Sequence, residues 1–193
     1  MPEFAAEYEA ALSCLAEALS GLEDHAVIGG LAVAVRGVPR TTRDINVLIA
    51  VPPIRLPATL ERLHDAGFTF ETQEVLAELR DDHLSRIHRG SVRVDLMSAV
   101  LGVFVEVVRS ARWETVQGRR VRVASAEGLA LLKLIAFRPQ DEADLMGLVA
   151  VNRGSLDVSR IREWYRQVGE VTDPSWRALE RMLIEVEGRE GRR

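Results

Sequence analysis

The hydrophobic positions of this chain follow two periods, and their order predicts helices and strands mixed along the sequence. Apolar residues recur at helical spacing over residues 3–22 and predict an amphipathic helix. Residues 43–50 alternate instead, which predicts a strand with Asp44 and Asn46 on one face. Residues 73–80 are ambiguous. We also expect a turn or strand end at 26–28, helices at 31–36, 60–67, 101–111, 125–137 and 139–151, a short strand at 68–71, hairpins at 83–97 and 113–123, and two C-terminal helices.

Composition and charge favour a soluble globular protein. The 193 residues are 47% apolar and 28% charged, which is ordinary for such a protein and enough for one domain, or for a core with a helical appendage. The formal net charge of −4 gives no bulk attraction to nucleic acid or to an anionic membrane.

The cysteine count and the apolar runs predict a cytoplasmic location. Cys14 is the only cysteine, so no internal disulfide can form and a reducing compartment is the simplest expectation. No charged and apolar leader opens the chain, and no apolar run approaches the length of about 20 residues that spans a bilayer. We therefore expect no membrane association.

A glycine pair precedes one of the expected helices. Gly29 and Gly30 open an apolar run of small residues, where a phosphate could approach backbone N–H groups at the positive end of the helix dipole. Glycine pairs also mark ordinary tight turns, so a purely structural role stays open. The full dinucleotide-binding and P-loop fingerprints are absent from the sequence.

Two aspartates lie on different expected strands. Asp44 is a carboxylate on an otherwise hydrophobic strand, which is costly to bury without a compensating cation. One interpretation is a salt bridge with Arg40 or Arg43. The other is a divalent cation bound through oxygen atoms, with Asp95 as a second ligand and Asn46 offering a neutral carbonyl oxygen.

Lys133 is the only lysine of the chain, and apolar residues surround it on every side of its helix. A buried ammonium must reach water or meet an anion. The candidate anions are Asp44, Asp95, Asp141 or a bound phosphate, and a structural lysine–aspartate bridge is an equal alternative. Asp141 also lies in the first turn of a helix, where a carboxylate complements the dipole.

Four segments in order resemble the nucleotidyltransferase superfamily with the DNA polymerase β-like fold. They are Ile-Gly-Gly-Leu-Ala-Val at 28–33, Arg-Thr-Thr-Arg-Asp-Ile-Asn-Val at 40–47, Val-Asp-Leu-Met at 94–97, and residues 127–145. The last segment is similar to the E-x-L-x-x-x-K-x-x-A-x-R-x-x-D-x-x-D pattern of the AbiEii-like branch. That branch includes the toxins of type IV toxin–antitoxin pairs and many small bacterial proteins.

The resemblance implies an α/β (α+β) fold, with a mixed sheet flanked by helices. It places a nucleotidyltransferase core with an N-terminal helix in residues 1–124, and a helical part packed on the same core in residues 125–193. The implied chemistry is attack of an acceptor hydroxyl on the α-phosphate of an NTP, with pyrophosphate leaving. Two Mg²⁺ ions would be held by Asp44, Asn46 and Asp95, and Asp95 would help to deprotonate the acceptor. The implied catalytic residues are Asp44, Asp95 and Lys133, and the implied nucleotide contacts are Gly29, Gly30, Arg40, Thr42, Lys133, Arg138 and Asp141.

Asn46 departs from the family pattern, which usually has a second aspartate there. Loss of that carboxylate weakens the binding of one metal ion. The sequence therefore leaves two functions open, a Mg²⁺-dependent nucleotidyltransferase or a degenerate relative that binds a nucleotide or a partner. An RNA, protein or small-molecule acceptor, a cognate antitoxin and a homo-oligomer are all compatible with the resemblance.

Overall fold

The computed structural model describes residues 2–188, and its contacts divide the chain into two compact units. The first unit contains Met1–Ala32 and Thr41–Ala124. The second contains Val33–Arg40 and Ser125–Arg193. Because Val33–Arg40 belongs with the C-terminal residues, the chain passes between the units more than once.

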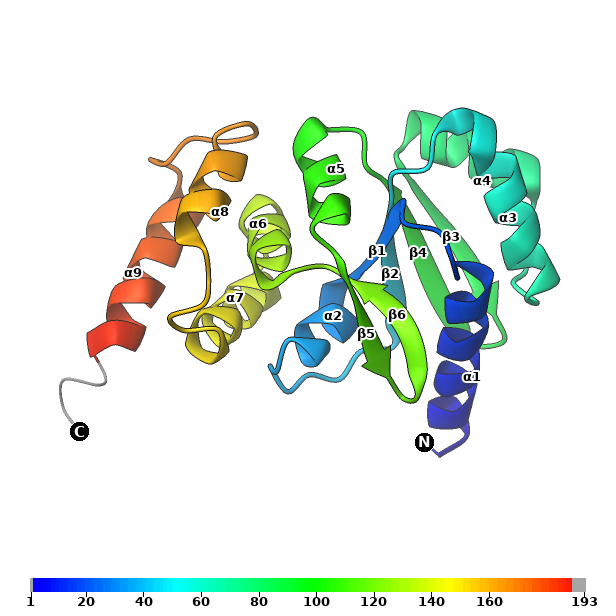
Figure 1. The fold of residues 1–193 in the computed structure, drawn as a ribbon, viewed down its shortest axis with the longest axis horizontal. Helices are drawn as coiled ribbons and strands as arrows, with labels where there is room; N and C mark the ends of the chain where they lie inside the picture. The colour runs from blue at the N-terminus through cyan, green and yellow to red at the C-terminus, as the bar shows by residue number, and fades with distance from the viewer. Residues whose placement is uncertain (1, 189–193) are drawn as a thin grey trace. The chain divides into compact units, whose positions relative to one another are not determined.

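A mixed six-stranded sheet forms the centre of the first unit (Figure 1). Its strands are β1 (His25–Ile28), β2 (Asp44–Ile49), β3 (Leu84–Arg89), β4 (Val92–Ser98), β5 (Arg112–Val116) and β6 (Arg119–Val123), in the order β3-β4-β2-β1-β6-β5. The pairs β2–β4 and β1–β6 are parallel, and the other pairs are antiparallel. The predicted α/β class with a mixed sheet is therefore confirmed.

Helices cover both faces of this sheet. They are α1 (Pro2–Ala18), α3 (Leu56–Asp65), α4 (Thr72–Asp81) and α5 (Gly102–Arg109), with a 3-10 turn at Pro53–Arg55 and the start of α2 (Gly29–Val35). In Figure 1, α5 lies on one side of the strands, whereas α1, α3 and α4 lie on the other. The alternation in β2 and β4 buries Ile45, Val47, Val94 and Leu96 at 1% exposure or less, which leaves the polar residues between them on the opposite face.

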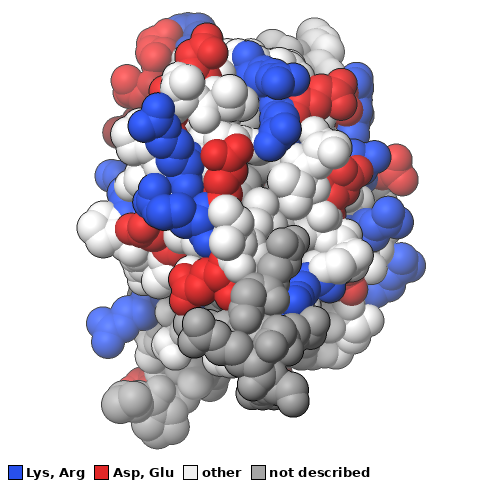
Figure 2. Space-filling model, turned by 90° about the vertical axis from the view of Figure 1, so that its left-hand side faces the viewer, with Lys and Arg blue, Asp and Glu red and all other residues white. Residues whose placement is uncertain are grey.

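The second unit is helical. It contains α6 (Ala126–Ala136), α7 (Pro139–Val151), α8 (Val158–Tyr165) and α9 (Pro174–Gly188). Ser125 caps α6 by accepting a hydrogen bond from the backbone N–H of Gly128. Trp176 is fully buried, and its ring lies 5.4 Å from that of Tyr165. In Figure 2, acidic and basic side chains are interspersed on the coloured surface that faces the viewer.

Most predicted elements lie where the pattern placed them, and the differences have local causes. Residues 68–71 form one isolated bridge, Thr69 to His88, because α4 begins directly after them at Thr72. The ambiguous residues 73–80 belong to that helix. The first helix ends at Ala18 rather than at residue 22, and Gly21 adopts a left-handed φ of +74° just beyond it. Within residues 2–188, no helix combines the length and the apolar character that crossing a bilayer requires.

Candidate active site

Asp44, Asn46 and Asp95 lie on two neighbouring parallel strands in the middle of the sheet. In the register of β2 and β4, Asp44 is the partner of Arg93 and Asn46 is the partner of Asp95. Residues in register project from the same face of a sheet, so the structure brings these polar side chains together. Their proximity depends on strand pairing between residues about 50 positions apart in the chain.

Arg93 binds both carboxylates. Its Nη2 lies 2.9 Å from Oδ2 of Asp44, and its Nε lies 3.0 Å from Oδ1 of Asp95. One of the two interpretations of Asp44 was a salt bridge with Arg40 or Arg43, and the structure shows a salt bridge with Arg93 instead. Arg93 takes that place because the parallel pairing of β2 and β4 puts it beside Asp44. The alternation along residues 92–97 places Arg93 on the same face as Asp95, but only the strand pairing puts it beside Asp44.

Thr42 and Arg93 keep Asp44 ionised. Burial alone would raise the pKa of Asp44, but hydrogen bonds from Thr42 and Arg93 outweigh it and hold the pKa below its ordinary value. The hydroxyl of Thr42 donates to Oδ1 at 2.6 Å, and Arg93 donates to Oδ2. Thr42, predicted to contact nucleotide, is thus in direct contact with the carboxylate.

Asp95 has the opposite electrostatic character. Burial raises its pKa above the ordinary value and the charge of Asp44 adds to this effect, whereas Arg93 and Arg86 oppose it. Its side chain is 13% exposed, with Nε of Arg86 at 3.8 Å from Oδ1. Although Nε of Arg93 is close, Oδ1 is buried without a hydrogen bond from the described residues. A proton or a cation that binds this oxygen must therefore compete with the charge of Arg93.

Gly29 lies against the side chain of Asn46. Gly29 has a left-handed φ of +67°, and a Cβ at this position would lie 2.8 Å from Nδ2 of Asn46. The antiparallel pairing of Ile28 with Asn46 produces this approach. The glycine is therefore required by the backbone conformation and by Asn46, independently of the phosphate role predicted for Gly29 and Gly30.

The remaining predicted residues form an ion network in the second unit. Nζ of Lys133 lies 2.6 Å from Oδ1 of Asp141 and 2.6 Å from Oδ2 of Asp144. Arg40 pairs with Asp144, and Nε of Arg138 lies 2.7 Å from Oδ2 of Asp141. Lys133, Asp141 and Asp144 are all less than 8% exposed. Of the anions considered for Lys133, Asp141 is the one that the structure places in contact with it. This contact is the structural lysine–aspartate bridge that the sequence offered as an alternative to phosphate binding.

A match to a family model assigns the chain to a protein family. The family is described as nucleotidyl transferase of unknown function (DUF2204), and its model matches residues 10–180. The chain belongs to this family. The predicted resemblance to nucleotidyltransferases is thereby confirmed at the level of the family, whereas the AbiEii-like branch stays a prediction.

The chain is similar to several solved structures. JHP933 from Helicobacter pylori matches with a TM-score of 0.51 at 12% identity, over 99% of this chain and 96% of the other. An antigenic nucleotidyltransferase-like protein from Paracoccidioides brasiliensis has a TM-score of 0.49 at 14% identity, over 91% and 93% of the two chains. The antibiotic-resistance factor ANT(2'')-Ia has a TM-score of 0.48 at 17% identity, over 95% and 93%. No curated protein matches the sequence.

The oxygen atoms around Asp44 and Asp95 fit one divalent cation better than two. Within residues 2–188, no three His, Cys, Asp or Glu side chains are grouped so that they could hold a metal ion. The candidate donors are the carboxylates of Asp44 and Asp95 and the amide oxygen of Asn46. Mg²⁺ keeps several waters and needs only one or two protein carboxylates. A second ion lacks a carboxylate at Asn46, and Arg93 already contributes one positive charge.

A cavity adjoins Asp44 in the same unit. It has a volume of about 500 Å³ and is lined by Phe4, Ala5, Tyr8, Thr41, Thr42, Arg43 and Gln117. Tyr8 donates a hydrogen bond to the backbone oxygen of Asp44 at 3.3 Å. The volume falls within the usual range for small-molecule sites. Sequence periodicity assigned Phe4 and Tyr8 only to the apolar side of a helix, because it carries no information about the loop at 41–43 that faces them.

Proposed function

We propose that this protein transfers a nucleoside monophosphate from an NTP to an acceptor hydroxyl. The observation that supports this best is the pair Asp44 and Asp95, held on adjacent strands with different environments. One carboxylate is kept ionised by hydrogen bonds. The other has a raised pKa, and the charge of Arg93 lies 3.0 Å from its Oδ1. Two carboxylates in different environments can differ in role, so both can be ligands of a cation while the one with the raised pKa also accepts a proton.

The proposed reaction forms one bond and breaks one bond at the α-phosphorus. The acceptor oxygen bonds to phosphorus, the bond to the β-phosphate oxygen breaks, and pyrophosphate leaves. Asp95 takes the proton of the acceptor hydroxyl. Asp44, Asp95 and the amide oxygen of Asn46 would hold Mg²⁺, which when bound neutralises charge on the phosphates. Thr42 and Arg93 keep Asp44 in its orientation.

The other predicted contacts have less support in the structure. Lys133, Arg40 and Arg138 bind aspartates of their own unit, so their contacts with nucleotide phosphates stay predictions. Gly29 and Gly30 stay predictions as well, since α2 has only seven residues and Gly29 already has a structural reason. The division into residues 1–124 and 125–193 and the cytoplasmic location are likewise part of this proposal.

Calorimetric titration of NTPs in the presence of Mg²⁺ tests the proposed site. The wild type should bind at least one NTP, and Asp44→Ala should weaken that binding by about tenfold or more because a charged ligand of the cation is lost. Asp65→Ala removes an exposed carboxylate from α3 and serves as the matched control. Identical heats for the wild type and Asp44→Ala would remove the site.

A second function is favoured by Asn46 together with Arg93. Position 46 carries an amide in place of a carboxylate, and Arg93 is bound to both aspartates. Both features reduce the negative charge that would attract a divalent cation to the site. In this case the protein binds a nucleotide or a partner without transfer. Absence of labelled product from α-labelled NTPs, with NTP binding retained, would favour this function.

We also propose that the protein is a toxin of the AbiEii-like branch. It would act on an RNA or protein acceptor and would be controlled by a cognate antitoxin. The support is the segment at 127–145, whose lysine and two aspartates form the buried network. Induced expression in a bacterial host should arrest growth, and Asp44→Ala should relieve the arrest. Normal growth during wild-type expression would count against the toxin.

A further inference from the structure

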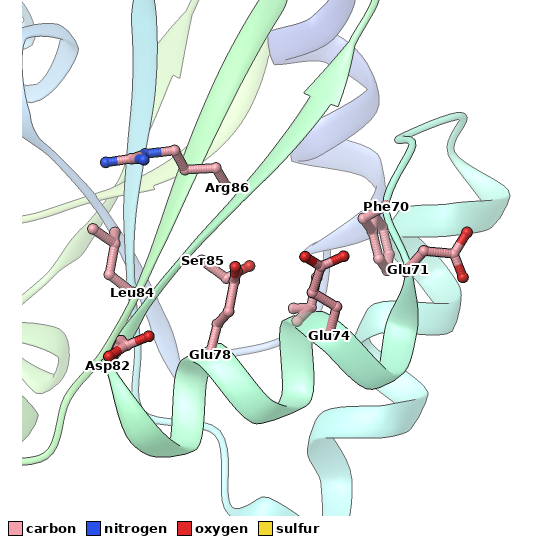
Figure 3. Close-up of a pocket in the computed structure, with 9 residues that line it drawn as sticks. Phe70, Glu71, Glu74, Glu78, Asp82, Leu84, Ser85 and Arg86 are labelled. Carbon is pink, nitrogen blue, oxygen red and sulfur yellow. The ribbon is translucent and has the colours of Figure 1, made fainter.

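An acidic groove lies along the edge of the sheet in the first unit. It occupies about 420 Å³ between α4 and the edge strand β3 (Figure 3). Glu71, Glu74, Glu78 and Asp82 line it from α4 and the residues that flank it. Figure 3 shows Glu74 and Glu78 pointing from the helix toward β3, so their carboxylates face the groove.

The negative charge of the groove is not balanced within it. Arg86 is its only basic lining residue. The guanidinium of Arg86 points away from α4 in Figure 3 and lies 3.8 Å from Asp95. Among the ion pairs between described residues, none includes the carboxylates of Glu74 or Glu78. Like charges four residues apart on a helix repel each other, and a bound cation relieves this repulsion.

Ser85 gives an independent sign of a missing partner. It lines the groove from β3 and is 1% exposed. Its Oγ is buried and has no hydrogen-bond partner among the described residues. Buried hydroxyls are almost always hydrogen-bonded, because leaving one unpaired costs its lost hydration. A ligand that carries N–H donors into the groove would provide the partner.

The spacing of the carboxylates favours an extended organic cation over a metal ion. Glu74, Glu78 and Asp82 follow one another at intervals of four residues, which separates them by about 6 Å along a helix. No three carboxylates in the described part of the chain are grouped closely enough for a metal ion. Several positive charges spread along one molecule match this row, whereas a nucleic-acid phosphate would be repelled.

We propose that the groove between α4 and β3 binds an organic polycation with several protonated amines spaced along an alkyl chain. Its amines pair with Glu74, Glu78 and Asp82, and one of them donates to Oγ of Ser85. Through Arg86, the groove adjoins Asp95. The binding itself does not depend on the proposed nucleotidyl transfer.

Titration with spermine measures this binding directly. The double variant Glu74→Gln/Glu78→Gln should weaken spermine binding by about tenfold, since two ion pairs are lost. Glu61→Gln/Asp65→Asn removes two exposed carboxylates with the same four-residue spacing from α3, and it should leave the affinity within about twofold. Equal loss in both double variants would show that spermine binds only to the overall negative charge, and would overturn the proposal. No binding by the wild type would also overturn it.

Two further variants separate this site from the transfer site and from folding defects. Ser85→Ala removes the unpartnered hydroxyl, so it should weaken spermine binding while leaving thermal stability unchanged or higher. Unchanged affinity in Ser85→Ala would overturn the proposal, because the unpaired hydroxyl is the independent sign of a ligand in the groove. Asp44→Ala should bind spermine normally even if it no longer binds NTP. Loss of spermine binding and loss of NTP binding can therefore be measured separately, so the two proposals can fail independently.

Discussion

Arg93 and Asp44 are register partners on neighbouring parallel strands, and the guanidinium of Arg93 lies 2.9 Å from the carboxylate of Asp44. The same side chain reaches Asp95 at 3.0 Å. An internal cation therefore lies where the proposed divalent cation would bind, and the two compete for the same oxygen atoms.

Removal of Arg93 should strengthen the binding of divalent cations. In Arg93→Gln, the two carboxylates lose their shared positive charge, and we expect Mg²⁺ affinity to rise by roughly tenfold. Manganese titration followed by electron paramagnetic resonance would measure the change. Arg80→Gln, which removes an exposed arginine paired with Asp81, is the control. A lower cation affinity in Arg93→Gln would contradict competition and indicate that Arg93 positions the ligands.

A carboxylate at position 46 should also strengthen the binding of divalent cations, by adding a negative ligand. Asn46→Asp adds a negative oxygen beside Asp95, so we expect tighter Mg²⁺ binding by roughly tenfold. The transfer of label from an α-labelled NTP then distinguishes the two proposed functions. A strong increase in transfer indicates a degenerate site in the natural protein, whereas unchanged transfer shows that asparagine suffices.

Gly29 should tolerate alanine less well than a glycine with the same backbone conformation. Gly21 has a φ of +74° with no atom near the position of a Cβ, so Gly21→Ala should cost about 1 kcal/mol in the free energy of unfolding. Gly29→Ala carries the same strain and also meets Asn46, so it should cost about 2 kcal/mol more. Urea denaturation of both variants measures this difference, and equal losses would show that Asn46 moves aside freely.

The buried network of Lys133 should contribute strongly to stability. Lys133→Met leaves Asp141 and Asp144 with arginine partners only, and we expect a loss of about 3 kcal/mol in the free energy of unfolding. A double-mutant cycle with Asp144→Asn isolates the pair. The double variant should lose less than the sum of the single losses. Additive losses would mean that Lys133 and Asp144 act independently.

His25 should make the protein less stable in weak acid. Burial, aided by the charge of Arg122, lowers the pKa of His25 from 6.5 to about 4. Between these values the unfolded chain binds a proton that the folded protein does not, so stability falls as the pH falls from 6.5 toward 4. The full effect is about 3 kcal/mol. Urea denaturation from pH 7 to pH 4.5 should show a smaller loss in His25→Gln than in the wild type, and equal losses would contradict the buried neutral histidine.

The sequence predicted the elements better than their contacts. Alternation located β2 and β4 and placed Asp44, Asn46 and Asp95 on strand faces, because burial of one face imposes that pattern on neighbouring residues. The role of Arg93 depended on which strands pair and in which direction. That choice is made by the whole sheet, and local periodicity does not contain it.

The network around Lys133 shows the same limit in the second unit. The sequence identified a buried lysine and named Asp141 among its candidate anions, but the contact itself depends on how α6 and α7 fold back on each other. The ion pair of Arg40 with Asp144 joins residues about 100 positions apart and could not be predicted from spacing. The groove at α4 was also missed, since its segment was ambiguous in period and its charges resembled an ordinary solvated face.

The assignment of Val33–Arg40 to the second unit has a consequence for dissecting this protein. Val33 is fully buried, and Val38 packs where a Cβ on Gly147 would lie 2.6 Å away. A fragment that stops at Ala124 keeps both valines but loses the helix that packs on Val38. A fragment that starts at Ser125 lacks Arg40, the partner of Asp144. One cleavage of the backbone between Ala124 and Ser125 therefore leaves both pieces incomplete, so neither unit can be prepared intact as a single continuous fragment.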